Sequence, residues 1–272
     1  MRKLVSRLVE ILTAPITGEL RAIRRLQEEQ KKEIDLLKRI LQVNLLPVRN
    51  KIMSREEVEK IKYDQIWVAE GYNHVSPGET AIKCLPIIPY FQDNNVRTIL
   101  DVGCGSGKAM KLLMSSVHGF AVYGFDISRN CLDEEWHDQR DKVLQCGYLW
   151  KRDDIKGVFD AIYCTDVLEH IPADKIDDAL SNISSHMRAV GYLQIALFPD
   201  LFGQEYLGEP LHLIVEEPGW WLAAIERNGM RIERYEICSL KDGRLVVLRD
   251  KAVDISQDQY WLCCFVRSVA GR

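Results

Sequence analysis

The sequence predicts an α/β fold whose centre is a doubly wound, mostly parallel sheet of seven strands. Three observations support this fold class. From Val96 onward, short apolar runs alternate with segments of helical periodicity, which is the pattern of β-α-β units. The first apolar run leads directly into the glycine-rich segment Gly103–Gly107, after which a helical segment begins. Beyond residue 230 the apolar runs follow one another without helices, and we therefore expect antiparallel C-terminal strands.

A basic helical arm precedes this sheet and occupies residues 1–50. The arm carries 11 Lys or Arg and 6 Asp or Glu, so its net charge is +5, whereas the rest of the chain has a net charge of −9. Residues 1–14 are amphipathic and basic, and peripheral contact with an anionic membrane surface is one interpretation of them. Residues 19–48 have apolar side chains at heptad spacing, which predicts a short coiled coil that joins copies of the chain. The alternative is a long helix that packs on its own domain.

Residues 51–92 are predicted to form a helical segment that covers the ligand site as a lid. Ser54 and Glu57 have the spacing of a capping box, so a helix is expected over residues 54–70. A loop rich in glycine and proline follows, and a second, apolar helix is expected near residues 79–91.

Residues 93–272 make up the third and main part of the chain. Strand-like runs lie near residues 97–102, 121–126, 142–146, 159–164, 191–198, 230–237, 244–249 and 259–267. Helices are expected near residues 106–116, 129–139, 174–188 and 217–228. The sequence Lys241-Asp242-Gly243 predicts a tight turn among the C-terminal strands.

The cysteines and the apolar runs indicate the cellular setting. None of the eight cysteines forms a Cys-x-x-Cys pair, and several lie in strand-like runs, so we expect buried, reduced thiols and no metal site. The longest uncharged stretch, Leu112–Phe125, has 14 residues, whereas a membrane-spanning helix needs about 20. No secretory signal is apparent in the first residues. These features predict a soluble, cytoplasmic protein, with peripheral membrane contact of the arm as the one variant.

The glycine-rich segment is typical of loops that hold nucleotide-like ligands. Gly103, Gly105 and Gly107 follow the strand-ending Asp101 at alternate positions, where the absence of side chains lets the backbone turn and approach a ligand. The spacing excludes a P-loop and disfavours a dinucleotide fingerprint, because the Lys-Ser/Thr pair and the third glycine of those motifs are missing. Asp126 ends the second strand, 25 residues after Asp101, where a carboxylate can accept both hydroxyls of a ribose.

A third segment, Asp166-Val-Leu-Glu-His-Ile-Pro172, follows the fourth strand at the edge of the sheet where α/β proteins bind ligands. Together with the glycine segment and Asp126, it resembles the class I S-adenosylmethionine-dependent methyltransferases, and within them the small-molecule branch of the ubiquinone-biosynthesis type. The resemblance covers roughly residues 96–237. It implies a Rossmann-like fold, S-adenosyl-L-methionine as the cofactor, and an enzyme that transfers methyl groups.

The resemblance also implies a set of cofactor-binding residues. In this family pattern, Asp101 would approach the methionine amino group, and Asp126 would bind the ribose hydroxyls while Ile127 packs on the adenine. The full set is Asp101, Gly103, Cys104, Gly105, Gly107, Asp126, Ile127, Cys164, Thr165 and, as a lid residue, Tyr72.

The chain departs from the family pattern in two places. After the third strand, residues 145–149 contain no acidic residue, and Gly147 and Tyr148 are the candidates that remain for contacts to the adenine. The C-terminal tail is also longer and richer in strands than the family minimum requires.

His212, in the sequence Gly208-Glu-Pro-Leu-His-Leu, is the candidate catalytic residue. Methyl transfer to a hydroxyl benefits from a general base, and histidine is the side chain most often used for that purpose. A core or capping histidine is the alternative interpretation of this residue. Trp67 and His74 are further candidates for contacts to the acceptor.

The acceptor is expected to be a small molecule, a lipid-linked intermediate or a glycan, with oxygen as the favoured atom. A nucleic-acid acceptor is disfavoured, because residues 51–272 carry net negative charge and the phosphate backbone demands a basic face. The alternative function is a non-catalytic, donor-binding scaffold protein that assembles partners through its N-terminal coiled coil.

Overall fold

The chain divides into two compact units, Met1–Met53 and Ser54–Arg272. The computed structural model describes residues 23–31, 53–68, 72, 76–115, 119–200, 202–249, 254–255 and 258–269. In the first unit, residues 23–31 are helical. Residues 1–14 and the remainder of the predicted coiled coil lie outside the described residues, so membrane contact and self-association stay predictions.

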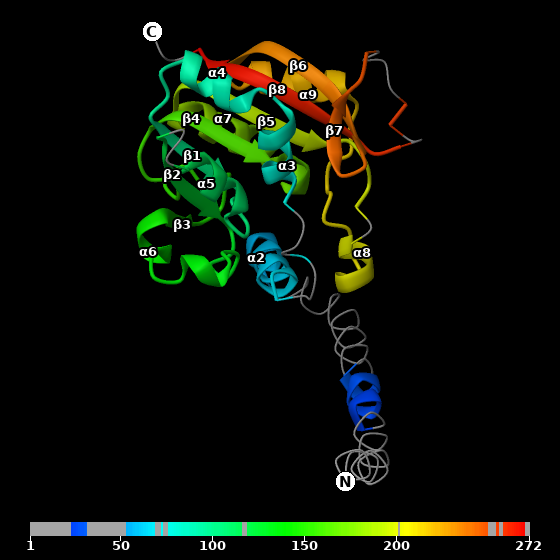
Figure 1. Cartoon of the computed structure of the whole chain (residues 1–272). Coiled ribbons are helices and arrows are strands. Elements are labelled where there is room, and N and C mark those ends of the chain that lie inside the picture. Colours follow the sequence, from blue (N-terminus) through cyan, green and yellow to red (C-terminus); the bar gives the residue numbers. More distant parts are fainter. Residues whose placement is uncertain are drawn as a thin grey trace, which may run out of the picture. The chain divides into compact units, whose positions relative to one another are not determined.

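Among its described residues, the second unit contains one eight-stranded sheet with the strand order β3-β2-β1-β4-β5-β8-β6-β7 (Figure 1). The strands are β1 (Thr98–Val102), β2 (Ala121–Asp126), β3 (Leu144–Cys146), β4 (Phe159–Thr165), β5 (Met187–Ala196), β6 (Met230–Lys241), β7 (Arg244–Val247) and β8 (Tyr260–Ser268). The strands β1 to β5 pair in parallel, whereas β8 is antiparallel to β5 and β6, and β7 is antiparallel to β6. The predicted doubly wound, mostly parallel α/β class with antiparallel C-terminal strands is therefore confirmed.

The strand order reverses between β1 and β4. From β1 the sheet continues through β2 and β3 on one side, and through β4 and β5 on the other. At such a switch point the loops that follow the two strands diverge and leave a crevice at the carboxyl edge of the sheet. The glycine segment follows β1 and the Asp166–Pro172 segment follows β4, so the topology brings both motifs to this crevice.

An edge strand extends the sheet beyond the seven strands expected. Asp242 and Gly243 have φ angles of 49° and 73°, the left-handed conformation of a tight hairpin turn. The chain reverses at this turn, and β7 returns alongside the end of β6. The strand-like run predicted at residues 244–249 thus adds an eighth strand.

Helices cover both faces of the sheet (Figure 1). The α-helices are α2 (Arg55–Ile66), α3 (Pro77–Cys84), α4 (Ile87–Asp93), α5 (Lys108–Leu113), α6 (Arg140–Val143), α7 (Ile176–His186), α8 (Phe202–Leu207) and α9 (Pro218–Arg227). Apolar side chains of α7 and α9 belong to the core on one face, whereas those of α3, α4 and α5 belong to the core on the other. This two-sided burial explains the nearly continuous apolar sequence of the central strands.

The apolar helix predicted at residues 79–91 is divided into α3 and α4. Leu85 is extended, with ψ 155°, and Pro86 follows it as the N-cap of α4. A residue before proline is driven out of the helical region by the proline ring, so the break follows from the local sequence.

The helix predicted at residues 129–139 does not form; a 3-10 turn, Glu134–Trp136, lies there instead. The amide of Asp133 donates to the carbonyl of Ser106 in the glycine segment, at 3.2 Å. Trp136 is buried, and its indole packs against the backbone of the same segment. The prediction was wrong because these contacts with the glycine segment replace the hydrogen bonds of a helix.

All eight cysteines are free thiols. Six are buried, whereas Cys84 is half-buried and Cys146 is exposed. The predicted class of buried, unpaired cysteines is thus observed for most of them.

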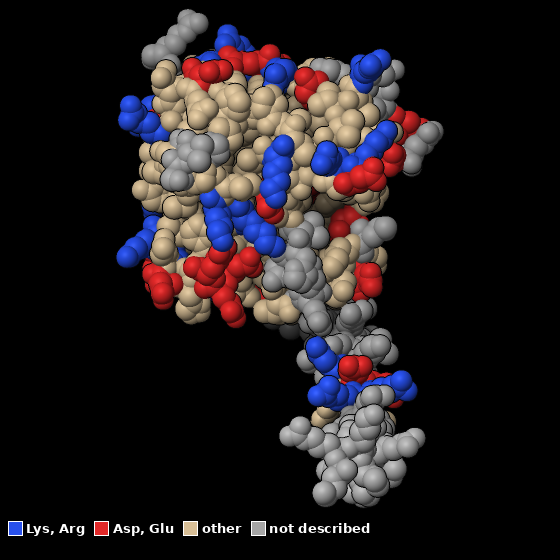
Figure 2. All heavy atoms as spheres, in the orientation of Figure 1, with Lys and Arg blue, Asp and Glu red and all other residues tan. Residues whose placement is uncertain are grey.

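The surface of the second unit carries charges of both signs. On the face shown in Figure 2, groups of basic and acidic side chains lie scattered among uncharged residues. Within the part of the chain that the structure describes, the helices are too short or too polar to cross a membrane.

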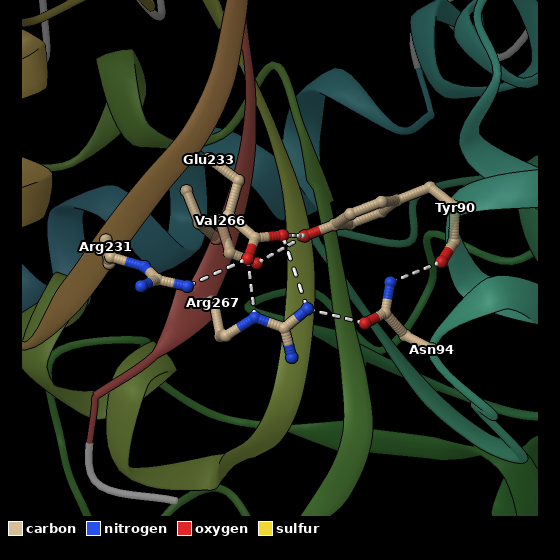
Figure 3. Close-up of polar contacts among 6 residues, drawn as sticks. All are labelled: Tyr90, Asn94, Arg231, Glu233, Val266 and Arg267. Atoms are coloured by element: carbon tan, nitrogen blue, oxygen red, sulfur yellow. Dashed lines mark hydrogen bonds and ion pairs between the residues drawn. The ribbon is translucent and has the colours of Figure 1, made fainter.

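A polar cluster fixes α4 to β6 and β8 at the amino edge of the parallel strands (Figure 3). The Tyr90 hydroxyl lies 3.0 Å from Glu233 Oε2 and 2.9 Å from the carbonyl oxygen of Val266. Arg267 pairs with the Glu233 carboxylate at 2.6 Å, and Arg231 pairs with it at 3.1 Å. One carboxylate therefore gathers three donors and holds the last helix before the sheet against its C-terminal strands.

Candidate active site

The glycine segment turns sharply at the carboxyl end of β1. Gly103, Gly105 and Gly107 have φ angles of 70°, 51° and 81°, in the left-handed region that glycine adopts without strain. A Cβ atom at Gly103 would lie 2.1 Å from a methyl carbon of Val167, and one at Gly105 would lie 2.7 Å from the ring of Trp67. Both positions require glycine, because the loop after β4 and the end of α2 contact this backbone directly.

Two buried carboxylates lie beside the glycine segment. Asp126, at the end of β2, accepts hydrogen bonds from the amides of Gly105, at 3.1 Å, and Ser128, at 2.9 Å. Burial raises the pKa of Asp126 to about 6, although these hydrogen bonds oppose the shift. Asp101 is 2% exposed, and its Oδ2 atom has no hydrogen-bond partner among the described residues. Burial, with Asp126 nearby, raises the pKa of Asp101 well above its usual range.

Two further carboxylates fix the loop after β4. Asp166, with a φ of 52°, accepts hydrogen bonds from Gln194, at 2.7 Å, and Trp261, at 2.8 Å, so it links this loop to β5 and β8. One oxygen of Glu169 accepts the amide of Ala196, at 3.0 Å, whereas the other has no partner within the described part of the chain. Burial raises the pKa of both carboxyls, and the nearby Asp166 adds to the rise at Glu169.

Two histidines face each other across the end of the crevice. The rings of His170 and His212 are 4.8 Å apart and nearly perpendicular. Nδ1 of His170 lies 3.1 Å from the Leu211 carbonyl, and Nδ1 of His212 lies 2.5 Å from the Phe198 carbonyl. A carbonyl accepts only, so each Nδ1 atom donates a proton to the carbonyl that it faces. Burial, and then the neighbouring His212, lowers the pKa of His170 well below its usual value, which keeps that ring neutral.

The crevice contains two adjoining cavities. The smaller cavity has a volume of about 100 Å³ and lies over the ends of β2 and β3, where Asp126, Ile127, Gly147 and Leu149 line it. The larger cavity has a volume of about 250 Å³ and lies over the glycine segment and the two histidines. Both cavities are lined by Trp67, Tyr72, Gly103, Asp166 and His170.

Helix α2 forms a lid over the crevice. The predicted capping box is present, because Ser54 and Glu57 exchange side-chain and backbone hydrogen bonds at its first turn. Along the helix, Glu56 accepts from the indole of Trp150, at 3.1 Å, and Asp64 accepts from the hydroxyl of Ser128, at 2.7 Å. The helix therefore crosses the ends of β3 and β2 and reaches the glycine segment through the residue that follows it.

Helix α8 adds a second, aromatic side to the lid. Ile66 of α2 packs with Leu207 and Leu211 in a small apolar core that the two helices share. Phe202 contacts Tyr72, with ring centroids 5.1 Å apart, and Phe202 also lines the larger cavity.

Most residues predicted for the site line these cavities. They are Tyr72, Asp101, Gly103, Cys104, Gly105, Asp126, Ile127, Gly147, Thr165 and His212, together with Trp67. Cys164 does not, because it alternates with Thr165 on β4 and its side chain is fully buried in the core. Gly107 packs against Trp136 and lines neither cavity, and Tyr148 also lines neither cavity. His74 lies outside the described residues.

The wall residues that were not predicted include Glu59 and Tyr63 from α2, and Asp200 and Phe202 from the segment after β5. Asp200 accepts the amides of Phe202 and Gly203, at 3.0 and 2.7 Å, so it caps the start of α8. An aspartate before an apolar helical run is a recognisable signal for such a cap. Glu59 and Tyr63 reach the site through the docking of α2, for which the sequence holds no local signal.

Comparisons with known proteins agree with this geometry. Residues 78–201 match the family model described as "Methyltransferase domain". A segment of 78 residues is 35% identical to the mitochondrial ubiquinone biosynthesis O-methyltransferase of Saccharomyces cerevisiae. The match covers 27% of this chain and 25% of that relative, so the chain spans about a quarter of the length of the curated relative that it matches.

Solved structures share the fold. Magnesium protoporphyrin IX methyltransferase from Synechocystis PCC 6803, with bound S-adenosylmethionine, superimposes with a TM-score of 0.52 at 15% identity, over 80% of this chain and 99% of that chain. An S-adenosylmethionine-dependent methyltransferase from Clostridium acetobutylicum gives a TM-score of 0.51 at 14% identity, over 76% and 98% of the two chains. With the family match, and with the glycine, Asp126 and Asp166 motifs at one crevice, residues 78–201 are a methyltransferase domain of the class I S-adenosylmethionine-dependent type.

Proposed function

We propose that the protein transfers a methyl group from S-adenosylmethionine to an oxygen of a small-molecule acceptor. The observation that carries the proposal is the pair of cavities, which meet at Gly103. The smaller contains the carboxylate of Asp126 among apolar walls, and the larger contains two histidines whose Nδ1 atoms face backbone carbonyls. One cavity suits a nucleoside, and the other suits the reacting groups and the acceptor.

The residues of the crevice fit this donor. Asp126 is placed to accept the two ribose hydroxyls, while Ile127 offers an apolar contact to the base. The unpartnered Oδ2 of the buried Asp101 is an acceptor for the ammonium group of the methionine part. When bound, S-adenosylmethionine supplies a methyl group that is already activated on a sulfonium. The chain has to hold the two reactants in line and exclude water, and Trp67, Tyr72 and Phe202 of the lid provide the apolar cover.

His212 is the proposed general base. Its Nδ1 is occupied by the Phe198 carbonyl, so Nε2 is the atom that takes a proton from an acceptor hydroxyl as the oxygen attacks the methyl carbon. His170, neutral and in edge-to-face contact, holds the His212 ring in place. The name of the yeast relative, an O-methyltransferase, supports oxygen as the acceptor atom.

The charge distribution supports a small or lipid-linked acceptor over a nucleic acid. Acidic and basic side chains are mixed on the described surface of Figure 2, whereas a phosphate backbone calls for a basic face. We include a glycan among the proposed acceptors. We also propose that the protein is cytoplasmic and that residues 1–14 contact the membrane surface.

Calorimetric titration with S-adenosylhomocysteine and, separately, with NADH tests the donor site. We expect the wild type to bind the first ligand and not the second. Asp126→Ala should weaken that binding about 100-fold, because two hydrogen bonds to a charged group are lost. Asp177→Ala, which removes an exposed carboxylate on α7, is the matched control and should leave the affinity unchanged. Binding of neither ligand to the wild type would overturn the methyltransferase proposal.

His212→Ala tests catalysis against the scaffold alternative. With an acceptor found by screening hydroxylated small molecules, turnover should fall about 100-fold or more while the affinity for S-adenosylhomocysteine is retained. Unchanged turnover would remove the assignment of His212 as the base. Donor binding without turnover of any acceptor would favour the non-catalytic scaffold.

The arm is proposed to join copies of the chain through residues 19–48. Sedimentation of the full chain and of residues 53–272 tests this, because Ser54–Arg272 is a compact unit. We expect the full chain to be oligomeric and the shorter form monomeric. Equal association states for the two forms would refute the coiled coil.

A further inference from the structure

The lid helix presents a polar stripe to the smaller cavity. Glu59, Tyr63 and Trp67 are spaced four residues apart, so they lie along one face of α2. All three line the cavity, together with Ile127, Leu149 and other apolar side chains of the sheet edge. A slot with apolar walls and a polar rim of this kind is suited to a flat, nitrogen-containing ring.

Docking contacts fix the position of this stripe. Glu56, almost one turn before Glu59, is bonded to Trp150 and pairs with Lys151 at 2.6 Å. Asp64, directly after Tyr63, is bonded to Ser128. The segment between these two anchors cannot turn its inner face away from the cavity without breaking both contacts. Glu59 is 6% exposed, which agrees with an inward direction.

Three carboxylates line the smaller cavity: Asp126, which the proposed function assigns to the ribose, Asp166, which is bonded to β5 and β8, and Glu59. Both oxygens of Asp126 accept backbone amides, and both oxygens of Asp166 accept side-chain donors. Both oxygens of Glu59 face a single donor within the described part of the chain, the Nζ atom of Lys62 on the same helix, which lies 3.3 Å from Oε1 and 3.1 Å from Oε2. A carboxylate has about four acceptor positions, so this pair leaves Glu59 with capacity for a donor in the cavity.

Two buried donors on the same stripe have no partner. The hydroxyl of Tyr63 and the indole N–H of Trp67 are shielded from water, and neither makes a hydrogen bond to another described residue. Buried polar atoms are rarely left without a partner unless a ligand or water completes them. The Glu59 carboxylate can accept a hydrogen bond, and the Tyr63 hydroxyl and the Trp67 indole can each donate one. This set complements an aminopurine, whose ring nitrogens accept hydrogen bonds and whose exocyclic amino group donates them.

We propose that Glu59 accepts a hydrogen bond from the exocyclic 6-amino group of the donor's base, so that the lid helix selects adenine. The inference rests on the proposed function, because it assumes that the nucleoside part of the donor occupies the smaller cavity. It also accounts for the exit of β3, where residues 145–149 hold no acidic side chain and the amide of Tyr148 is taken by Asp154, at 2.8 Å. Lys62 is the positioning residue, because it lies between Glu59 and Glu209 and fixes the direction of the Glu59 carboxylate.

Binding of two matched nucleosides tests the proposal with the full-length protein. S-adenosylhomocysteine carries the 6-amino group, and S-inosylhomocysteine carries a 6-oxo group in its place. The wild type should prefer the adenosyl compound at least about 10-fold, because a carboxylate facing a carbonyl oxygen has no proton to share. In Glu59→Gln the amide can donate to the 6-oxo group, so the ratio of the two dissociation constants should fall to about one or reverse.

Glu56→Gln is the control on the same helix. Its carboxylate anchors α2 outside the cavity, so this substitution should weaken both ligands by the same factor and keep their ratio. A ratio in Glu59→Gln equal to that of the wild type would show that Glu59 only balances Lys62, and would overturn the proposal. If Glu59→Gln fails to fold, the wild-type ratio still decides, since equal affinities contradict base selection. Binding of neither compound to the wild type would instead contradict the proposed function itself.

Discussion

The two edges of the sheet use carboxylates in opposite ways. At the amino edge, Glu233 is bonded to Arg267, Tyr90 and Arg231, and these contacts hold its pKa below the usual range although partial burial opposes them (Figure 3). At the carboxyl edge, burial raises the pKa of Asp101 and Glu169, and each keeps one oxygen without a partner among the described residues.

This difference separates a structural cluster from a ligand site. A polar group that finds its partners in the fold contributes to stability, whereas a buried group without a partner costs free energy until something completes it. The cluster at the amino edge connects α4 to β6 and β8, and an unpaired polar group there would only lower the stability of the fold. We therefore expect substitutions at the amino edge to change stability without changing ligand binding, and substitutions at the carboxyl edge to change ligand binding or the pH dependence of stability.

The largest effect is expected for Gly103→Ala. Its φ of 70° is strained for alanine, and the new Cβ would lie 2.1 Å from Val167, so the loop after β4 must move. The two costs add to about 4 kcal/mol in the free energy of unfolding, measured in urea. Binding of S-adenosylhomocysteine should be lost. Gly119→Ala is the matched control, because Gly119 has the same φ of 70° and a Cβ added there would meet no atom of the described residues within 4 Å. Equal losses for the two variants would show that backbone strain alone matters at Gly103.

Glu169→Gln should change the pH dependence of stability. The pKa of Glu169 is raised in the folded state, so folding binds a proton, and the stability it contributes is lost as the pH rises from about 4.5 towards the folded pKa. The variant cannot lose that proton and should therefore be more stable than the wild type at pH 8. The two proteins should converge as the pH falls to about 4.5 or below. Urea unfolding at both pH values measures the difference, and a wild type that is the more stable at pH 8 would contradict the assignment.

Glu233→Gln should have the opposite pH dependence. Because the pKa of Glu233 is lowered in the folded state, its contribution is present above about pH 4.5 and is lost as the pH falls through the folded pKa. The variant should lose about 1 kcal/mol at pH 7 and match the wild type in acid, with no change in affinity for S-adenosylhomocysteine. A change in that affinity would break the distinction between the two edges.

The sequence predicted those parts of the site that depend on local signals. The glycine segment, Asp126 and the Ser54–Glu57 box each follow from short spacings and were found where the spacing indicated. The alternation of apolar runs was enough for the parallel sheet and its antiparallel end. The conformation of these elements is determined by residues that are close together in the sequence, so the sequence alone is enough to predict them.

The remainder depends on contacts between distant segments. Glu59 lines the smaller cavity because α2 docks on the loop after β3, some 90 residues away, through the bond between Glu56 and Trp150. The expected helix at 129–139 was displaced by bonds to the glycine segment, which no local periodicity reveals. Cys164 was included in the predicted site because the family resemblance implies it, whereas the alternation along β4 directs its side chain into the core.

The smallest effect is expected at the N-terminus of α2, where a local capping box lies next to the contact between Glu56 and Trp150. Ser54→Ala removes the cap of α2 and costs about 1 kcal/mol locally, while the core of the sheet is untouched. Because α2 closes the crevice but does not build its floor, global unfolding should hardly change, and S-adenosylhomocysteine should bind at most about fivefold more weakly. Ser54→Thr retains a capping hydroxyl and should restore the affinity. If Ser54→Ala lowers global stability without affecting binding, α2 is part of the scaffold and not a lid, and the carboxyl edge owes its selectivity to the sheet alone.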